Sequence, residues 1–137
     1  MELPNRLYRL DFSIPLPTSN NRLQRSTATG RRFNTADYKA WKDEAGKDIM
    51  CQRAMMTMRR KINGYYGFAI VMNPAVKIDL NNALKASIDL MHIMGITDDD
   101  SMNRIGIYGV NPSIDPRRAL VSVWPVGSEQ YIEVRHG

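Results

Sequence analysis

The chain has 137 residues, 43% of them hydrophobic, so it is expected to fold as a single domain (residues 1–137) around a modest core. Its one cysteine excludes a disulfide-stapled secreted scaffold, and it shows neither an apolar run that could cross a membrane nor a signal-peptide core, which favours a cytoplasmic protein with no membrane partner. The formal net charge of +5 favours a polyanionic partner, nucleic acid first.

The N-terminal part is expected to contain a strand, a loop and a helix. Apolar and polar side chains alternate over residues 7–14, which predicts a half-buried strand that two prolines end. Residues 18–34 are polar and basic without any period, and a loop of this length in a compact domain is often functional. Thr35 can cap a helix that runs to about Arg60. The buried stripe of this helix is expected to be Tyr38, Trp41, Ala45, Ile49 and Met56.

The rest of the chain is expected to add five strands and a second helix. Residues 65–72 are apolar on both sides, which predicts a central strand, and residues 76–80 are expected to be extended. The second helix is predicted from about Asn81 to Met94, where Gly95 is a natural stop. The element order indicates an α/β (α+β) fold in which a mixed β-sheet packs with two main helices. The remaining strands are predicted at residues 104–110, 119–124 and 130–135, and the core face of the second helix at Leu84, Ile88 and Met91.

One segment, residues 77–85, carries side chains suited to a metal site. Asp79 and Asn81 are two positions apart, so in an extended segment their oxygens project to one face and can meet one hard cation. Lys85 follows Asn81 by four residues, a spacing that stacks the two side chains on a helix. Carboxylates that hold Mg²⁺ support phosphodiester cleavage by an activated water, and a nearby lysine stabilises the developing negative charge.

Three consecutive acids, Asp98, Asp99 and Asp100, follow the second helix in a turn. A cation would relieve their mutual repulsion, and the basic surround would attract DNA. If the helix and the neighbouring strand run antiparallel, this turn cannot return to the start of the helix by itself. It must then meet Asp79 through the folding of the sheet or across a subunit boundary, and the sequence leaves both routes open.

The same residues have structural alternatives. Asp79 or Asn81 can cap the second helix. The run of three acids can be a solvated turn, and Lys85 can pair with Asp89 one helical turn later. Spacing alone does not choose between these roles and a metal site.

Two longer patterns add to this spacing. PTSNNR follows the first strand at residues 17–22, and DLNN at residues 79–82 is followed by Lys85 and then by GITDDDS at residues 95–101. Together these patterns resemble the RusA family of Holliday-junction resolvases. That family shows a Pro-x-Ser-x-Asn-like element, then Asp-x-Asp-Asn-x-x-Lys and, past a helix, a Gly followed by Asp-Asp and a small residue. The order and spacing match from about residue 7 to residue 110.

The resemblance implies a homodimeric, Mg²⁺-dependent crossover junction endonuclease without a small-molecule cofactor. Such enzymes bind four-way DNA junctions and nick two strands symmetrically in recombination and repair, in the cytoplasm of a bacterial or phage-infected cell. On the matching positions, Asp79 and Asp100 would be metal ligands with Asp99 beside them. Lys85 would be the catalytic or phosphate-contacting lysine, and Asn82 would support the site.

Asn81 departs from the family pattern, which usually has a second aspartate there. An amide oxygen can ligate Mg²⁺ but brings no charge, so the change should weaken the site. Three accounts are open: a site that works with the remaining aspartates, a natural binder of branched DNA that does not cut, or a deliberate Asp→Asn change. The expected catalytic residues are Asp79, Asn81, Lys85 and Asp100, and the expected metal ligands are Asp79, Asn81, Asp99 and Asp100.

Basic residues outside this segment suit phosphate contacts. The loop at residues 18–34 holds four arginines within eleven positions, among Ser, Thr and Gly, as a flexible phosphate-binding arm would. Arg117 and Arg118 are expected to form a second basic spot, and the methionines of residues 50–58 an adaptable core or a dimer surface. The residues expected to contact DNA are Asn20, Asn21, Arg22, Arg25, Arg31, Arg32, Asn82 and Lys85.

Overall fold

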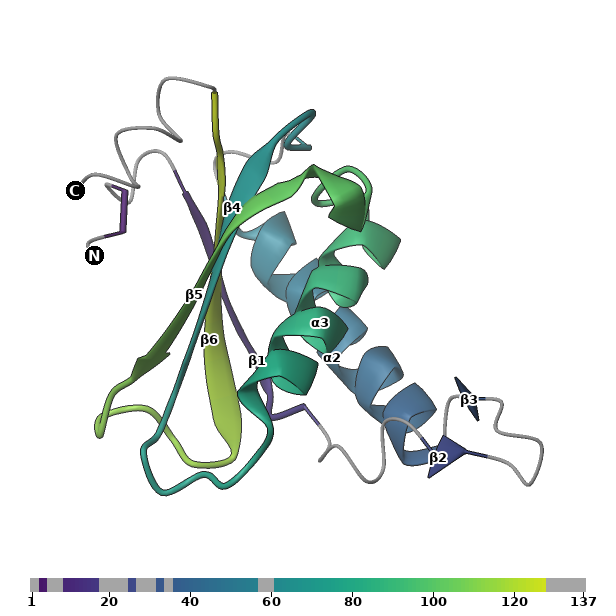
Figure 1. The fold of residues 1–137 in the computed structure, drawn as a ribbon, viewed down its shortest axis with the longest axis vertical. Coiled ribbons are helices and arrows are strands. Elements are labelled where there is room, and N and C mark those ends of the chain that lie inside the picture. The colour runs from purple at the N-terminus through teal and green to yellow at the C-terminus, as the bar shows by residue number, and fades with distance from the viewer. Residues whose placement is uncertain are drawn as a thin grey trace.

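A computed structural model shows a four-stranded mixed sheet with two helices on one of its faces (Figure 1). It describes residues 3–4, 9–17, 25–26, 32–33, 36–56 and 61–127. The strand order is β1-β6-β4-β5; β6 runs antiparallel to both of its neighbours, whereas β4 and β5 are parallel. This confirms the expected α/β (α+β) class. The elements are β1 (Leu10–Pro15), β2 (Arg25–Ser26), β3 (Arg32–Phe33), α2 (Ala36–Ala54), β4 (Tyr66–Met72), α3 (Leu80–Ile93), the 3-10 turn η2 (Asp100–Met102), β5 (Asn103–Val110) and β6 (Arg118–Pro125).

The central strand is β4, as its sequence predicts. It lies between β6 and β5 and is buried at six of its seven positions. Gly67 allows the Trp124 ring of β6 to pack against the β4 backbone, because a Cβ there would lie 2.4 Å from the indole. The main core fills the space between the sheet and the helices, and a smaller cluster around Ala69, Ile105 and Trp124 covers part of the opposite face.

The first helix, α2, is shorter than predicted. Its buried stripe of Tyr38, Trp41, Ala45 and Ile49 is confirmed, but the helix ends at Ala54 rather than near residue 60. The N–H groups of the next two residues, 55 and 56, bond to carbonyls three residues earlier, which tightens the last turn and ends the α-helical pattern. Met56 therefore lies past the helix, half-buried against the core, and Thr35 is outside the described residues.

The second helix, α3, ends as predicted at glycine. Gly95 has a φ of +71°, a conformation that glycine adopts without strain. Its N–H donates to the carbonyl of His92, and the N–H of Ile96 donates to that of Met91, the two bonds of a Schellman motif. This motif turns the chain from α3 toward the three consecutive acids. Of the predicted core face, Ile88 and Met91 are buried and Leu84 packs against the core from its edge.

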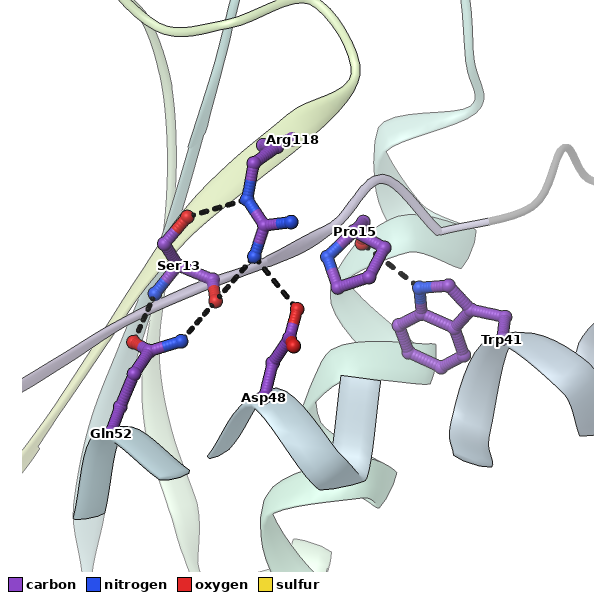
Figure 2. A network of polar contacts seen from close by, with 6 residues as sticks. All are labelled: Ser13, Pro15, Trp41, Asp48, Gln52 and Arg118. Atoms are coloured by element: carbon purple, nitrogen blue, oxygen red, sulfur yellow. Dashed lines mark hydrogen bonds and ion pairs between the residues drawn. The ribbon is translucent and has the colours of Figure 1, made fainter. Parts of the chain in front are cut away.

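The helix α2 seals the outer edge of β1 (Figure 2). The side-chain amide of Gln52 accepts from the N–H of Ser13 at 2.8 Å and donates to its carbonyl at 2.6 Å, as a neighbouring strand would. The indole of Trp41 donates to the carbonyl of Pro15 at 2.9 Å. Arg118 joins the same network by contacting both Ser13 and Asp48. One edge of the sheet is therefore covered, and β5 forms the other edge.

Two of the predicted strands need comment. Residues 76–80 do not form a strand, because a turn precedes them and the helix already begins at Leu80. The side-chain oxygen of Asn73 accepts from the N–H of Ala75 and closes this turn. The side-chain NH₂ of Asn73 donates to the carbonyls of Pro112 and Ile114. The predicted strand at 130–135 lies outside the described residues, as do residues 7–8 of the first strand.

No helix among the described residues is both long and apolar enough to cross a membrane.

Candidate active site

Asp79 is the N-cap of α3. Its backbone is extended, and its Oδ1 accepts from the N–H groups of Asn81 at 2.9 Å and Asn82 at 3.2 Å. These donors have no partner within the helix, so the cap stabilises the first turn. The capping role predicted as an alternative to metal binding is thus present. The carboxylate is exposed, and the structure assigns no described partner to its second oxygen.

Asn81 is already helical, as the second residue of α3. The prediction that Asp79 and Asn81 share one face of an extended segment is therefore wrong, because the helix begins between them. The amide oxygen of Asn81 accepts a hydrogen bond from the hydroxyl of Tyr108, near the end of β5. This contact fixes the start of α3 to the far end of β5. Sequence reasoning missed Tyr108, since nothing in an alternating strand shows which helix residue lies opposite.

Lys85 lies one turn after Asn81 on α3 and is exposed, on the side of the helix that the spacing predicts. Its predicted alternative partner, Asp89, instead accepts a hydrogen bond from the hydroxyl of Tyr38 at 3.2 Å. Burial and this carboxylate together raise the pKa of Tyr38 to about 12. No ion pair joins Lys85 to Asp89, both of which the structure describes, so the lysine is available for another anion.

The three acids of residues 98–100, here called the acid turn, have unequal roles. Asp98 is structural: it accepts from the N–H of Gly64 at 2.7 Å and pairs with Lys61 at 3.0 Å, and these bonds lower its pKa. Asp99 caps η2 by accepting from the N–H of Ser101 at 3.0 Å, which lowers its pKa. Asp98 thus anchors the turn against the segment that enters β4.

Asp99 and Asp100 form a close carboxyl pair on the surface. Interaction with the Asp99 carboxyl is the largest cause of the raised pKa of Asp100, and desolvation adds to it. Two carboxylates this close cannot both be charged without a cost, and a hard cation relieves that cost with oxygen ligands. Both residues are exposed, so a cation and a phosphate can approach.

The acid turn and Asp79 lie at opposite ends of α3. The helix has fourteen residues, which corresponds to a length of about 20 Å. Figure 1 shows α3 running back along the sheet, with the acid turn preceding the start of β5 at the far end. Within the described residues no three His, Cys, Asp or Glu side chains gather where they could hold a metal ion.

A single chain therefore does not bring the four predicted ligands together. Asp79 and Asn81 do not meet Asp99 and Asp100 around one Mg²⁺ ion within one subunit, because α3 lies between the two pairs. The route through the folding of the sheet is therefore not seen in the described residues, and the route across a subunit boundary stays a prediction.

The residues expected to contact DNA are only partly described. Residues 25–26 and 32–33 pair as two short antiparallel strands, with Arg25 opposite Phe33, so the predicted loop contains two short strands. Asn82 is half-buried in the first turn of α3. Asn20, Asn21, Arg22 and Arg31 lie outside the described residues.

The predicted second basic spot is largely neutralised. Arg117 pairs with Asp115 at 3.1 Å, which raises the pKa of the guanidinium and lowers that of the carboxyl. Arg118 pairs with Asp48 at 2.8 Å and is tied into the β1 edge network. Neither arginine is a free phosphate ligand, because each already has a carboxylate partner. Sequence spacing did not reveal Asp48, which lies 70 residues away from Arg118.

No protein-family model matches the chain, and no curated protein matches it as a relative. The resemblance to the RusA family therefore rests on the motifs at residues 17–22, 79–85 and 95–101.

Proposed function

We propose that this protein is a Mg²⁺-dependent, structure-selective endodeoxyribonuclease that resolves four-way DNA junctions by paired symmetric nicks. The observation that carries the proposal is the pair of adjacent, exposed carboxyls of Asp99 and Asp100 at the start of η2, on a chain of net charge +5. Such a pair favours a hard cation, and the surrounding positive charge favours a phosphate backbone. The RusA-like motifs supply the substrate class, branched DNA in recombination and repair.

The exposed side chains allow a division of roles. Asp99 and Asp100 supply carboxylate oxygens for Mg²⁺, and Asp79 has a second oxygen beyond the one that caps α3. The ammonium group of Lys85 suits a contact with the scissile phosphate, because no described carboxylate pairs with it. Bound Mg²⁺ would supply the charge neutralisation and water activation that phosphodiester cleavage needs.

The direct test compares a synthetic four-way junction with a linear duplex of the same sequence, with and without Mg²⁺. We expect paired nicks in the junction only with Mg²⁺, and no comparable cutting of the duplex. Asp79→Asn and Asp100→Asn should remove cutting while junction binding persists, and Lys85→Ala should slow cutting by roughly 100-fold. Wild-type cutting rates in both Asp79→Asn and Lys85→Ala would show that the site is misassigned.

The capping role of Asp79 decides which substitution is informative. Asparagine caps helices about as well as aspartate, so Asp79→Asn removes the charge while keeping the cap. Asp79→Ala removes both and serves as the matched control for a loss of stability. Loss of cutting in Asp79→Asn with an unchanged unfolding midpoint therefore assigns the loss to the missing charge.

A second function, binding of branched DNA without cutting, is favoured by Asn81. This residue brings no charge, and its amide oxygen already accepts from Tyr108. The Asn81→Asp variant separates the two functions, since a carboxylate there can still accept from the Tyr108 hydroxyl. Cleavage that appears only in Asn81→Asp supports the binding role, whereas strong cleavage by the unaltered chain overturns it.

A further inference from the structure

A tyrosine and an arginine stack on each other beside the acid turn. The guanidinium carbon of Arg104 lies 4.1 Å from the centre of the Tyr65 ring, which is a cation–π contact. Tyr65 directly precedes β4 and Arg104 is the second residue of β5, so the pair lies where these two strands begin. Tyr66 is fully buried, whereas 43% of the surface of Tyr65 is exposed. The Tyr65 side chain is thus open to a ligand.

Hydrogen bonds on both sides fix the backbone of Tyr65. Its carbonyl accepts from the N–H of Val126, just past β6, at 2.9 Å. The N–H of the preceding Gly64 donates to Asp98 at 2.7 Å, so Asp98 ties this segment to the acid turn. An aromatic side chain on a fixed backbone has few rotatable bonds left to order when a ligand binds. Tyr65 is therefore a pre-organised contact surface.

Arg104 is exposed, and two backbone carbonyls orient it. Its Nη1 donates to the carbonyl of Ser101 at 2.7 Å and to that of Asn103 at 3.3 Å, which uses both N–H groups of that nitrogen. Among the described residues, Nε and Nη2 have no hydrogen-bond partner and no carboxylate pairs with the side chain. These two nitrogens form one edge of the guanidinium, and such an edge binds a phosphate through two parallel hydrogen bonds. Arg104 therefore has a free donor edge.

We propose that Tyr65 and Arg104 bind one unpaired nucleotide of a DNA strand. Its base stacks on the pair, because aromatic rings and guanidinium planes are the surfaces on which unpaired bases stack. Its phosphate accepts from the free donor edge of Arg104. Ser101, whose carbonyl holds Arg104, directly follows Asp100, so this nucleotide lies next to the scissile phosphate. That placement rests on the proposed function, whereas the binding of an unpaired nucleotide does not.

The ring and the donor edge together select this ligand over others. A carboxylate of an acidic peptide would occupy the donor edge of Arg104 but would leave the ring of Tyr65 unused. A base within a duplex is covered on both faces by its neighbours, so only an unpaired base can stack on a protein ring. The net charge of +5 favours a polyanion over a neutral aromatic ligand. An unpaired nucleotide uses both parts of the pair.

The binding of an unpaired nucleotide is tested by fluorescence anisotropy without Mg²⁺. The probes are a short labelled oligothymidylate and a labelled abasic strand with the same number of phosphates, so that only the bases differ. We expect the unaltered chain to bind the oligothymidylate about tenfold more tightly than the abasic strand. Tyr65→Leu should remove this preference, and Tyr65→Phe should keep it because a ring remains. Equal affinities of the unaltered chain for the two strands, or an unchanged preference in Tyr65→Leu, overturn the site.

Arg104→Lys separates the planar group from its charge, and it decides the case if Tyr65→Leu does not fold. Lysine keeps the positive charge but has neither a flat face nor a fixed pair of donors. We expect Arg104→Lys to bind the oligothymidylate about fivefold more weakly. Arg117→Lys is the matched control and should leave binding unchanged, because Arg117 is also exposed but already pairs with Asp115. An equal loss in both variants, or a loss in neither, contradicts the role of Arg104.

The placement beside the scissile phosphate is tested with the four-way junction and Mg²⁺. Once the cleavage position is mapped, an abasic residue is placed at each of the two nucleotides that flank it. One of the two should slow cutting by the unaltered chain about tenfold and should not slow Tyr65→Leu further. Equal slowing in both chains overturns the placement. If the unaltered chain does not cut, the proposed function fails, while the preference for the oligothymidylate still decides the nucleotide site. A chain that cuts junctions without this preference keeps the proposed function and loses the nucleotide site.

Discussion

Single residues near the candidate site have both structural and chemical roles. One oxygen of Asp79 caps α3, and one oxygen of Asp99 caps η2, which leaves the rest of each carboxylate exposed. Both carboxylate oxygens of Asp98 already have partners, the N–H of Gly64 and the ammonium group of Lys61, so its role among the three acids is structural. Substitutions here must therefore be chosen so that the loss of a cap is not mistaken for the loss of a ligand.

Among the described glycines, Gly67 leaves the least room for a side chain. A Cβ at this position would lie 2.4 to 2.6 Å from three atoms of the Trp124 indole, which is itself buried. We expect Gly67→Ala to lower the free energy of unfolding by about 1–3 kcal/mol, because the ring or the central strand must shift. Urea denaturation measures this loss.

Gly46→Ala is the matched control for Gly67→Ala. The nearest atom to a new Cβ on Gly46 is the sulfur of Met94 at 3.1 Å, on a flexible side chain. Alanine also favours the interior of α2 by about 1 kcal/mol. Gly46→Ala should therefore be neutral or stabilising, and equal stability losses in both variants would contradict the packing described for Trp124.

Sequence patterns predicted which residues are buried better than which residues touch. Helical periodicity identified Tyr38, Ala45 and Ile49 as buried, because residues that recur with the period of the helix lie on the same face. Contacts such as Tyr108 with Asn81, or Gln52 with Ser13, join residues 27 and 39 positions apart on different elements. Their pairing depends on register and helix placement, which no local spacing encodes.

Elements differ in how well their ends were predicted. The end of α3 was found because glycine has a specific backbone requirement there, whereas the end of α2 has no such signal. The extended segment expected at residues 76–80 is a turn, since Asn73 closes the chain back on itself. The convergence of Asp79 and Asn81 was predicted from a spacing valid only in an extended chain, and the start of α3 at Leu80 removed that basis.

The start of α3 carries a prediction at the element scale. Asp79→Ala should lower the free energy of unfolding by about 1 kcal/mol, because the N–H groups of Asn81 and Asn82 lose their acceptor. Asp79→Ser and Asp79→Asn should retain most of the stability, since both side chains can accept the same bonds. Thermal or urea unfolding followed by circular dichroism measures the order. An alanine variant as stable as the serine variant would show that the cap contributes nothing.

The contact between α2 and the outer edge of β1 gives a second prediction at the scale of elements. Gln52→Glu keeps an acceptor for the N–H of Ser13 but loses the donor to its carbonyl. We expect a loss of about 1–2 kcal/mol in urea denaturation, as for a hydrogen bond broken at a half-buried group. Cys51→Ser, at the exposed neighbouring position, should change stability by less than about 0.5 kcal/mol. A Gln52→Glu chain as stable as the unaltered one would mean that water replaces the bond at no cost.

At the scale of the whole molecule, part of the positive charge is neutralised by carboxylates of the same chain. The net charge is +5, yet Arg117 and Arg118 are paired with carboxylates and the acid turn is exposed. The proposed DNA binding would then depend on the remaining cations, including those of residues 18–34. A homodimer, which the family resemblance implies, would present every such cation twice.

The salt dependence of junction binding tests whether the cations of residues 18–34 contact DNA phosphates. Without Mg²⁺, the logarithm of the binding constant should fall linearly with the logarithm of salt concentration, because each phosphate contact releases counterions. Arg25→Ala or Arg32→Ala should flatten that slope by about one if one subunit contacts DNA, and by about two if both arms of a dimer do.

The control for these arginines is a pair already neutralised within the chain. The double variant Asp115→Asn with Arg117→Gln removes one charge of each sign and leaves the net charge unchanged. Its slope should match that of the unaltered protein. If Arg25→Ala and Arg32→Ala also leave the slope unchanged, the arm does not contact phosphate. A flattening near two together with a dimer in sedimentation would instead place both arms on one junction, because the two subunits then act as one binding surface.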